Sequence, residues 1–589
     1  MGVGPAPGTL ARPPSRTRPA TRLRDRLAVL VGVLVVGLVH ARVSLDAVAP
    51  VQTKDEIGYL AAARLFATGD GAGLLTPDYA GGYAVGWGLL TAPLWWLSDH
   101  PPTVYGLSVA LNVLLAALLV LPATAVARRT GLGTPAAVLA AVVVAMGAGR
   151  LGYTGYALPE TLLTLQLTTL LWLLLRLWDV GPGAAASPRR SDLPVLALLA
   201  LVLAWLPTTH ARMLPLTLLA AASLASWSLA RRSPAGALAL TTGLLGAGAG
   251  WWLNGRVEAA LYGDVARTAV AAEQVAGLQV GDALALAVGH AWYAAVAWLG
   301  LALLGWSVAA AGVVDDWRDR RLGPWTWLAV AVVLQVGVGA AYLSGRLDEG
   351  GRVDQLVYGR YGDPLWFVVA LVGAAAVLGA ARPARLLGLT ALGLLTLAGA
   401  AAVALARNAD RVAGFVQLNV PGLEAWAWRD EAGFSVPWWQ ASLTAVLVLG
   451  LLAAAVLSSR PGARRRVVAL VVTGALLLGL ALVAERRNIE PRDAWIRSLF
   501  GVRELVEQSP QSDVLLVVDR PLLLSGNALQ WWLADRRTTV VEAEDVAAAA
   551  GPGDLVVAPT ATPPTGRDGT APELLGTDDT GTYGVWRLP

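Results

Sequence analysis

The sequence predicts an all-α polytopic membrane protein with about 13 transmembrane helices and outer juxtamembrane helices, followed by a small C-terminal α/β domain. Of the 589 residues, 56% are hydrophobic and only 15% are charged, and the mean hydropathy is +0.57. These values lie far outside the range of soluble globular chains. Apolar runs of roughly 20 residues recur along the chain, and each can cross about 30 Å of hydrocarbon as a helix. After residue 485 the runs give way to short strands alternating with helices.

Arginine-rich loops between the apolar segments predict the orientation. The predicted spans are 27–44, 104–126, 134–150, 160–178, 193–207, 212–230, 235–253, 283–313, 325–343, 364–380, 386–405, 438–458 and 466–484. Basic loops such as Arg128–Arg129, Arg231–Arg232 and Arg464–Arg466 follow every second span, and such loops stay on the cytoplasmic side of the membrane. We therefore expect a disordered basic tail, 1–25, in the cytoplasm and the C-terminal domain outside the cytoplasmic membrane.

One further apolar stretch, 84–97, decides the direction of every later span. It is too short to cross the bilayer, which takes about 20 helical residues. We interpret it as a juxtamembrane helix in the outer interface. The transmembrane domain is then 26–484, with a long first outer loop at 45–103.

Residues 485–589 predict an extracytoplasmic α/β domain. Its expected strands are Asp513–Asp519, Thr538–Glu542 and Asp554–Ala558, its helices are Leu522–Asp535 and Glu544–Ala550, and Thr582–Leu588 is expected to add an edge strand. The domain carries neither a Gly-rich phosphate loop nor a nucleophile elbow. We expect it to bind an acceptor or polymer rather than to take part in bond formation.

The charge and cysteine content exclude several function classes. The formal net charge is +4, but the basic excess sits in short loops, so it reflects membrane topology and predicts no nucleic-acid partner. The chain has no cysteine, which excludes disulfides and thiolate metal sites. Lys54 is the only lysine, a bias typical of a GC-rich genome such as that of an actinobacterium.

The segment directly after the first span concentrates chemistry-bearing residues. It reads Lys54-Asp55-Glu56-Ile57-Gly58-Tyr59-Leu60, and a helix continues from it to Thr68. Asp55 and Tyr59 share one face of that helix. Adjacent carboxylates at a membrane surface are costly to bury and therefore point to function. The alternative is that these are ordinary acids in the first turn of an interfacial helix, where the helix dipole favours them.

These residues resemble the signature of the GT-C superfamily of membrane glycosyltransferases. The segment Gly82-Tyr83 with Pro93 and Pro101-Pro102 is similar to that family's first outer loop, and Arg128-Arg129-Thr130-Gly131 to its inner turn. The segment Tyr156–Thr161, which contains Glu160, resembles the family's second acidic site. Thirteen spans with an outer C-terminal domain are similar to the subgroup that uses lipid-linked sugars, including aminoarabinose transferases and protein O-mannosyltransferases.

The resemblance implies transfer of a sugar from a polyprenyl-phosphate donor to a hydroxyl of an envelope glycan, lipid or protein. Asp55 is the predicted catalytic base, Glu56 would orient it or hold the sugar, and Glu160 would assist the acceptor or a metal. A phosphate leaving group needs cationic groups rather than a general acid, so one base suffices for an inverting transfer. No cofactor is predicted with certainty, and the involvement of a divalent cation stays open.

Three segments supply candidate substrate-binding residues. Lys54 and Tyr59 lie beside the acidic pair, His210 and Arg212 interrupt an apolar hairpin, and Tyr358, Arg360 and Tyr361 precede a span. The alternatives are a tight outer turn with a snorkelling arginine at 210–212, and an interfacial Arg–Tyr anchor at 358–361. His290, within a predicted span, is expected to be a hydrogen-bonded structural residue, and no zinc site is predicted.

Two other functions compete with sugar transfer. A transporter or flippase for lipid-linked saccharides would also carry intramembrane charges, although such proteins usually show repeated halves, which are not apparent here. A noncatalytic envelope scaffold would leave the Asp55–Glu56 pair without a purpose.

Overall fold

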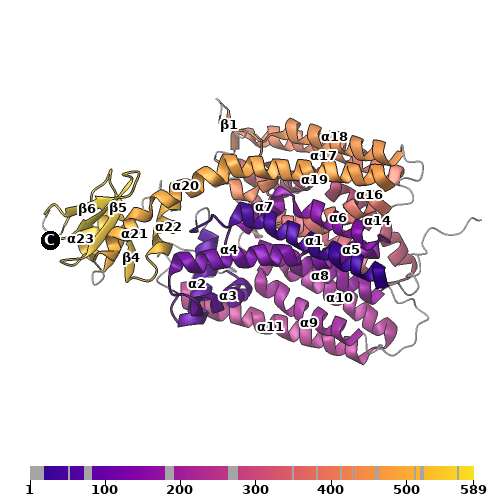
Figure 1. Ribbon diagram of the computed structural model, residues 1–589, viewed down its shortest axis with the longest axis horizontal. Helices are drawn as coiled ribbons and strands as arrows, with labels where there is room; N and C mark the ends of the chain where they lie inside the picture. The colour runs from indigo at the N-terminus through magenta and orange to yellow at the C-terminus, as the bar shows by residue number, and fades with distance from the viewer. Residues whose placement is uncertain are drawn as a thin grey trace, which may run out of the picture.

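A long helical bundle with a small sheet domain at one end makes up the computed structural model (Figure 1). The structure describes residues 19–589 apart from 51–53, 72–82, 179–191, 263–275, 346, 348–350, 380–382, 412–413, 427–428, 431–432, 458–462, 510–512, 518–522 and 567–568. Most of the predicted N-terminal tail, Gly82 and the loop at 189–190 lie outside the described residues.

The bundle is built from helices whose positions follow the predicted apolar segments. They are α1 (Pro19–Ser44), α4 (Pro101–Leu118), α5 (Val120–Arg129), α6 (Thr134–Ala145), α7 (Ala148–Thr154), α8 (Glu160–Trp178), α9 (Leu193–Thr209), α10 (Leu214–Arg231), α11 (Pro234–Tyr262), α13 (Val280–Ala297), α14 (Leu301–Arg318), α15 (Pro324–Ser344), α16 (Asp363–Gly379), α17 (Pro383–Asn408), α18 (Trp438–Leu457) and α19 (Ala463–Ala484). In the described part of the chain, 9 helices are long and apolar enough to cross a membrane, or 10 if the bent pair α6–α7 is one span.

Two predicted spans are interrupted in the structure. The segment 134–150 bends by 66° between α6 and α7. The segment 283–313 is not one helix, because α13 ends at Ala297 and α14 begins at Leu301. The break is formed by Leu299 and Gly300, both with positive φ, a backbone conformation that a glycine adopts without steric cost.

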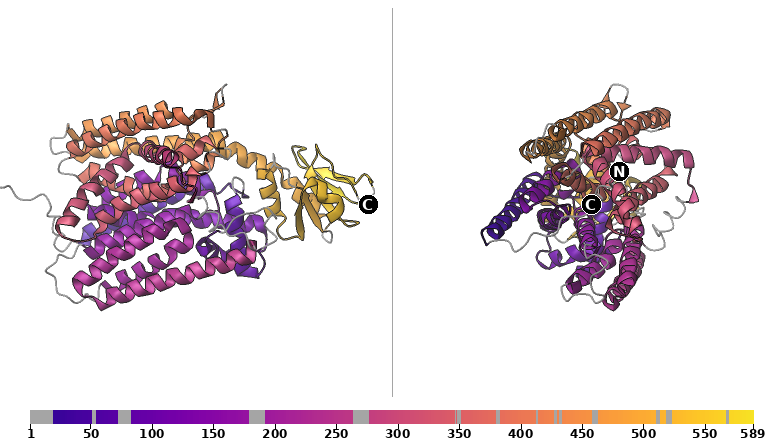
Figure 2. Two further views of the ribbon diagram at one scale, coloured as in Figure 1. Left: turned by 180° about the vertical axis from the view of Figure 1, so that it is seen from behind. Right: turned by 90° about the vertical axis from the view of Figure 1, so that its right-hand side faces the viewer.

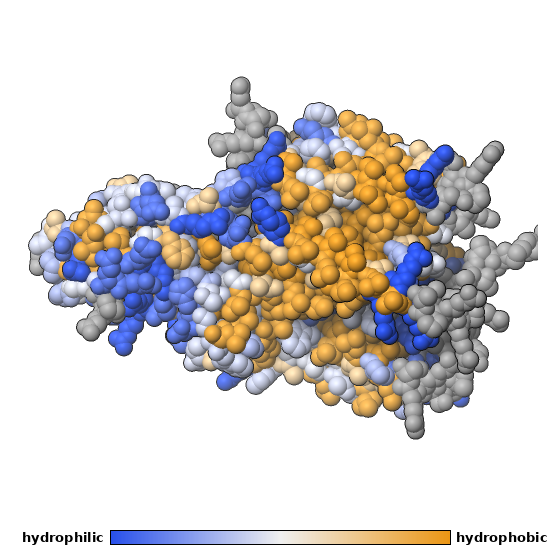
Figure 3. All heavy atoms as spheres, viewed as in Figure 1, coloured by the Kyte–Doolittle hydropathy of each residue, from blue (hydrophilic) through white to orange (hydrophobic). Residues whose placement is uncertain are grey.

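A broad hydrophobic band covers the outside of the bundle, while hydrophilic residues gather over the C-terminal domain and at the opposite end (Figure 3). The band includes exposed apolar residues on outer helices, such as Leu38 on α1, Leu245 on α11 and Leu447 on α18. Apolar surface of this extent is costly in water and fits contact with lipid. The chain is a multi-pass membrane protein.

The described part of the loop between α1 and α4 folds into short helices packed on the end of the bundle. They are α2 (Lys54–Thr68), α3 (Val85–Thr91) and the 3-10 helix η2 (Ala92–Trp96). At 7 and 5 residues, α3 and η2 cannot cross a bilayer, in agreement with a juxtamembrane position for 84–97.

The C-terminal domain is a five-stranded sheet with helices on both faces, and it projects beyond one end of the bundle (Figure 2). Its elements are α20 (Glu490–Ser498), α21 (Phe500–Glu507), β3 (Val514–Val517), α22 (Leu523–Trp532), β4 (Thr538–Val541), η11 (Ala543–Asp545), α23 (Val546–Ala549), β5 (Leu555–Pro559), β6 (Glu573–Thr577) and β7 (Tyr583–Arg587). The strand order is β4-β3-β5-β7-β6. The prediction of an edge strand at 582–588 is wrong, because β7 pairs antiparallel with both β5 and β6.

Candidate active site

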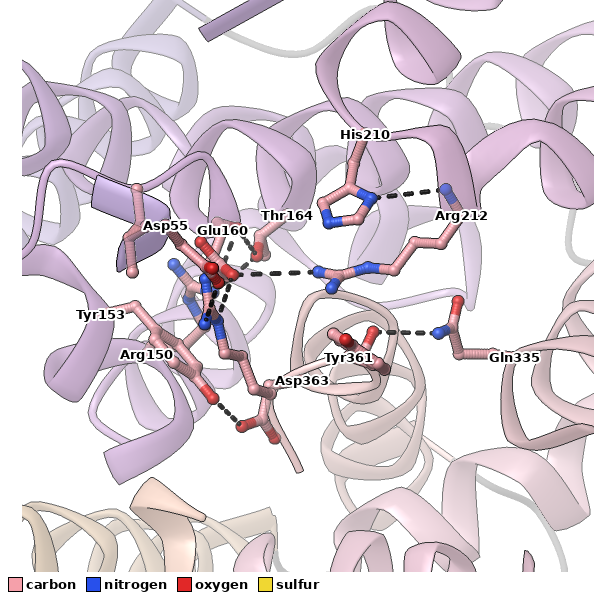
Figure 4. A network of polar contacts seen from close by, with 12 residues as sticks. Asp55, Arg150, Tyr153, Glu160, Thr164, His210, Arg212, Gln335, Tyr361 and Asp363 are labelled. Atoms are coloured by element: carbon pink, nitrogen blue, oxygen red, sulfur yellow. Dashed lines mark hydrogen bonds and ion pairs between the residues drawn. The ribbon is translucent and has the colours of Figure 1, made fainter. Parts of the chain in front are cut away.

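Charged and aromatic side chains from distant segments meet at the end of the bundle next to the C-terminal domain (Figure 4). They come from the first turn of α2, the start of α8, the junction between α9 and α10, and the turn before α16. The structure thus brings together four segments that the sequence marked separately.

Asp55 lies between a tyrosine and an arginine. Its Oδ1 accepts a hydrogen bond of 2.7 Å from the Tyr83 hydroxyl, and its Oδ2 lies 2.6 Å from Nη1 of Arg360. The Tyr83 ring crosses α2 at Gly58, where an added Cβ would lie 2.0 Å from the ring. Gly58 therefore leaves the room that Tyr83 needs to reach Asp55. The Asp55 side chain keeps 25% exposure, so a substrate can approach it.

Glu56 points into a different environment from its neighbour. Its side chain is fully buried, and its Oε1 accepts hydrogen bonds from the Tyr105 hydroxyl at 2.7 Å and from the backbone N–H of Ala157 at 2.9 Å. These contacts tie α2 to α4 and to the segment before α8. The geometry suits a residue that orients the helix carrying Asp55.

Arg360 joins the two carboxylates that the sequence singled out. Its Nε donates to Oε1 of Glu160 at 2.8 Å, while its Nη1 contacts Asp55. Burial alone would lower the pKa of Arg360, but Glu160 and Asp55 outweigh burial and raise it well above its ordinary value. The Arg360 backbone N–H donates to the carbonyl of Asn419 at 3.0 Å, which fixes the turn before α16.

Arg212 is a buried cation without hydrogen bonds from its side chain. Its Nη2 lies 3.9 Å from Oε1 of Glu160, which is too long for a hydrogen bond, and its guanidinium stacks 4.6 Å above the Tyr361 ring. Within the described part of the chain, none of its three guanidinium nitrogens has a hydrogen-bond partner. Its backbone is ordered by His210, whose Nδ1 accepts from the Arg212 N–H at 3.3 Å.

Tyrosines line the same region. Tyr59 is buried and its ring centroid lies 5.1 Å from that of Tyr83, while Tyr358 and Tyr361 are 4.5 Å apart. Burial, with Glu160 and Asp55 nearby, raises the pKa of Tyr59, so its hydroxyl stays neutral and can donate a hydrogen bond.

Two other sequence candidates lie outside this group. Lys54 begins α2, but its side chain lies outside the described residues. His290 is buried on α13 and its Nε2 is 3.1 Å from the carbonyl oxygen of Gln355, which confirms the expectation of a hydrogen-bonded structural histidine. In the described ranges, no group of three or more His, Asp or Glu residues could hold a metal ion.

Sequence reasoning missed a second set of buried polar residues beneath the site. Arg150 on α7 donates to the hydroxyls of Thr164 at 2.6 Å and Thr161 at 3.1 Å. Asp363 accepts hydrogen bonds from the hydroxyls of Tyr153 at 3.1 Å and Tyr293 at 2.9 Å. An arginine at the end of the apolar segment 134–150 was the available signal, because charges within membrane segments usually have a partner.

Sequence comparison finds no matching family model and no matching curated protein, whereas comparison of structures does find matches. ArnT from Cupriavidus metallidurans bound to undecaprenyl phosphate aligns with a TM-score of 0.55 at 15% identity, over 95% of this chain and 97% of ArnT. The chain shares the ArnT fold. The apo form of ArnT aligns with a TM-score of 0.53 at 14% identity, over 96% of this chain and 98% of ArnT.

A weaker match is the arabinosyltransferase EmbB from Mycobacterium smegmatis, with a TM-score of 0.38 at 15% identity, over 81% of this chain and 43% of EmbB. The fold shared with ArnT agrees with the fold that the sequence resemblance predicted.

Proposed function

We propose that this protein transfers a sugar from a polyprenyl-phosphate donor to an acceptor hydroxyl at the outer face of the cytoplasmic membrane, in the assembly of an envelope glycan or glycoconjugate. The observation that carries the proposal is the buried Arg212, whose guanidinium has no hydrogen-bond partner among the described residues. A buried cation without hydrogen bonds is costly unless an anion completes it. A donor phosphate next to Asp55 and Glu160 would do so.

The reaction needs only one base. The acceptor hydroxyl attacks the anomeric carbon, the bond between that carbon and the phosphate oxygen breaks, and Asp55 takes the hydroxyl proton. The leaving polyprenyl phosphate keeps the bonding electron pair, and Arg212 and Arg360 stabilise its negative charge. A direct displacement of this kind inverts the anomeric configuration.

In this proposal, Arg360 pairs with Asp55 before the donor binds and contacts the donor phosphate afterwards. In the structure it is paired with Asp55 at 2.6 Å, a contact that withdraws the carboxylate from an incoming hydroxyl. A donor phosphate bound at Arg212 would compete with Asp55 for the Arg360 guanidinium. The Asp55 carboxylate would then be freer to accept a proton. Glu160, whose Oε2 has no hydrogen-bond partner in the described part of the chain, is placed to accept a hydrogen bond from the donor sugar or the acceptor.

The likeness to ArnT supports a polyprenyl phosphate as the lipid carrier, since ArnT is described bound to undecaprenyl phosphate. A transporter or flippase for lipid-linked saccharides would also need an anion site. The pairing of that site with the partly exposed carboxylate of Asp55 favours bond transfer. A noncatalytic scaffold would require neither group.

A transfer assay separates these three functions. Purified protein in nanodiscs or proteoliposomes receives a radiolabelled polyprenyl-phosphate sugar and extracted envelope acceptors. We expect label on the acceptor. Label that only moves between leaflets would support the transporter. The absence of both transfer and movement would support the scaffold.

For the topology, we propose thirteen spans with a cytoplasmic N-terminus and an extracytoplasmic C-terminal domain. Reporter fusions after Arg129, Arg232, Arg321 and Arg466 should report cytoplasm, and a fusion after Pro589 should report the outside. An outside signal at Arg129 would reverse the assignment, because it would make 84–97 a span.

A further inference from the structure

The C-terminal domain and helix α2 share one hydrophobic core. Ile57 and Leu60 of α2 belong to the same buried cluster as Val506 of α21, Leu516 of β3 and Val557 of β5. All five side chains are almost completely buried. A single continuous core means that neither part can move without exposing apolar surface of the other.

Two tryptophans of α22 contact the segments that pack beside α2. Trp531 and Trp532 are fully buried. The Trp531 indole N–H donates to the carbonyl of Pro101 at 3.0 Å, and that of Trp532 donates to the carbonyl of Val48 at 3.4 Å. The Trp531 ring also packs edge-on against Trp95 of η2 at 5.5 Å.

The contact surface lies on the side of α2 away from the site. At about 100° per residue, Arg64 is half a turn around the helix from Asp55, and Ile57 and Leu60 flank it on that far side. Arg64 donates to the carbonyl of Ala534, just after α22, and its guanidinium stacks on Trp95. The same short helix thus presents Asp55 on one face and binds the C-terminal domain with the other.

We propose that the C-terminal domain holds α2 in position, and that Trp531 and Trp532 are positioning residues for Asp55 in the transfer reaction proposed above. Helix α2 is only 15 residues long, and a helix of that length is marginal without packing. The bundle supports it on one side through Glu56. The C-terminal domain supports it on the other.

The sheet itself offers a matched control. Side chains alternate along its strands, so Leu516 and Val557 face α22, whereas Leu515, Val556 and Trp586 form a separate core on the opposite face. Trp586→Ala therefore removes a buried tryptophan from the same domain without touching the α2 contacts.

Hydrogen–deuterium exchange of the full-length protein in lipid nanodiscs tests the proposal without any sugar donor. Trp531→Ala and Trp532→Ala should speed exchange in the peptide 54–68 by about tenfold or more, since local opening follows the loss of packing. Exchange in 160–178 should not change. Trp586→Ala should leave 54–68 at the wild-type rate, and Trp531→Phe should restore most of the protection.

Two milder measurements complete the test. Arg64→Met removes the guanidinium, and with it both the hydrogen bond to Ala534 and the stacking on Trp95, and it should speed exchange in 54–68 to a smaller extent. In a transfer assay, Trp531→Ala should lower kcat with little change in the donor KM. Equal exchange in 54–68 for Trp531→Ala, Trp586→Ala and wild type would overturn the proposal, as would an equal rise in both variants. Because exchange is read without turnover, its result stands even if the proposed transfer reaction is wrong.

Discussion

Two arginines with buried side chains lie near the start of α8, one in the first turn of α7 and the other at the junction of α9 and α10. Arg150 donates hydrogen bonds to the side chains of Thr161 and Thr164 through its two terminal nitrogens. The Arg212 side chain keeps 7% exposure and lies 3.9 Å from Glu160. Its guanidinium has no hydrogen-bond partner in the described part of the chain.

The difference shows that burial of a charge does not by itself mark a functional residue. The two terminal nitrogens of Arg150 donate to hydroxyls of α8, so its side chain stabilises the packing of α7 against α8. Arg212 keeps strong donors in an environment of low dielectric, where a missing partner costs most. The hydrogen bonds, rather than the charge or the depth, are therefore the basis on which we propose a structural role for Arg150 and an anionic ligand for Arg212.

The largest loss of kcat is expected at Asp55, the proposed base. Asp55→Asn keeps the size of the side chain but removes the proton acceptor, so it should lower kcat by about 10²–10⁴-fold. Binding of undecaprenyl phosphate, measured separately in nanodiscs, should change far less. Asp46→Asn alters an exposed acid of the same outer loop and should transfer at the wild-type rate. If Asp55→Asn also transfers at that rate, the carboxylate mechanism is wrong.

Arg212→Ala tests the ligand half of the comparison. It should weaken binding of undecaprenyl phosphate by about ten- to hundredfold, because hydrogen bonds to charged groups contribute about 1.5–3 kcal/mol. The thermal unfolding temperature should fall less than in Arg150→Met, since the variant loses the stacking on Tyr361 and the 3.9 Å contact with Glu160 but no side-chain hydrogen bond. Arg318→Ala, an exposed arginine at the other end of the bundle, is the matched control. Unchanged lipid affinity in Arg212→Ala would remove the main support for the proposed donor site.

Arg150→Met tests the structural half. Two buried threonine hydroxyls would lose their donor, which should destabilise the protein by about 1–3 kcal/mol. The measurement is thermal unfolding in the same nanodiscs, and the affinity for undecaprenyl phosphate should stay close to that of wild type. A stable variant with weakened lipid binding would reverse the roles of Arg150 and Arg212.

The smallest effect is expected at Glu56. Glu56→Gln keeps one acceptor oxygen for Tyr105 and Ala157, so the loss of kcat should stay below about tenfold, the equivalent of one ordinary hydrogen bond. Tyr105→Phe removes the same contact from the other side. The double variant should therefore lose no more than the larger single loss. A loss at Glu56 as large as that at Asp55 would assign Glu56 to the chemistry as well.

Much of the candidate site could be predicted because its residues are exceptional in their local sequence. Asp55, Glu160 and Arg360 are charges at the ends of apolar segments, where few charges occur, and the structure places them within one ion-pair network. The local pattern could not reveal that Glu56 faces away from Asp55. That depends on the position of Tyr105, which lies 49 residues along the chain.

The sequence alone determined the apolar helices of the bundle, apart from the breaks within 134–150 and 283–313, and the alternation of strands and helices after residue 485, because hydrophobicity and its periodicity are properties of neighbouring residues. Only the tertiary structure decided that Arg360 lies between Asp55 and Glu160, that β7 is an inner strand, and that the C-terminal domain shares its core with α2. Each of these depends on contacts between residues far apart in the chain. Such contacts are chosen by packing of the whole molecule, which no local pattern records.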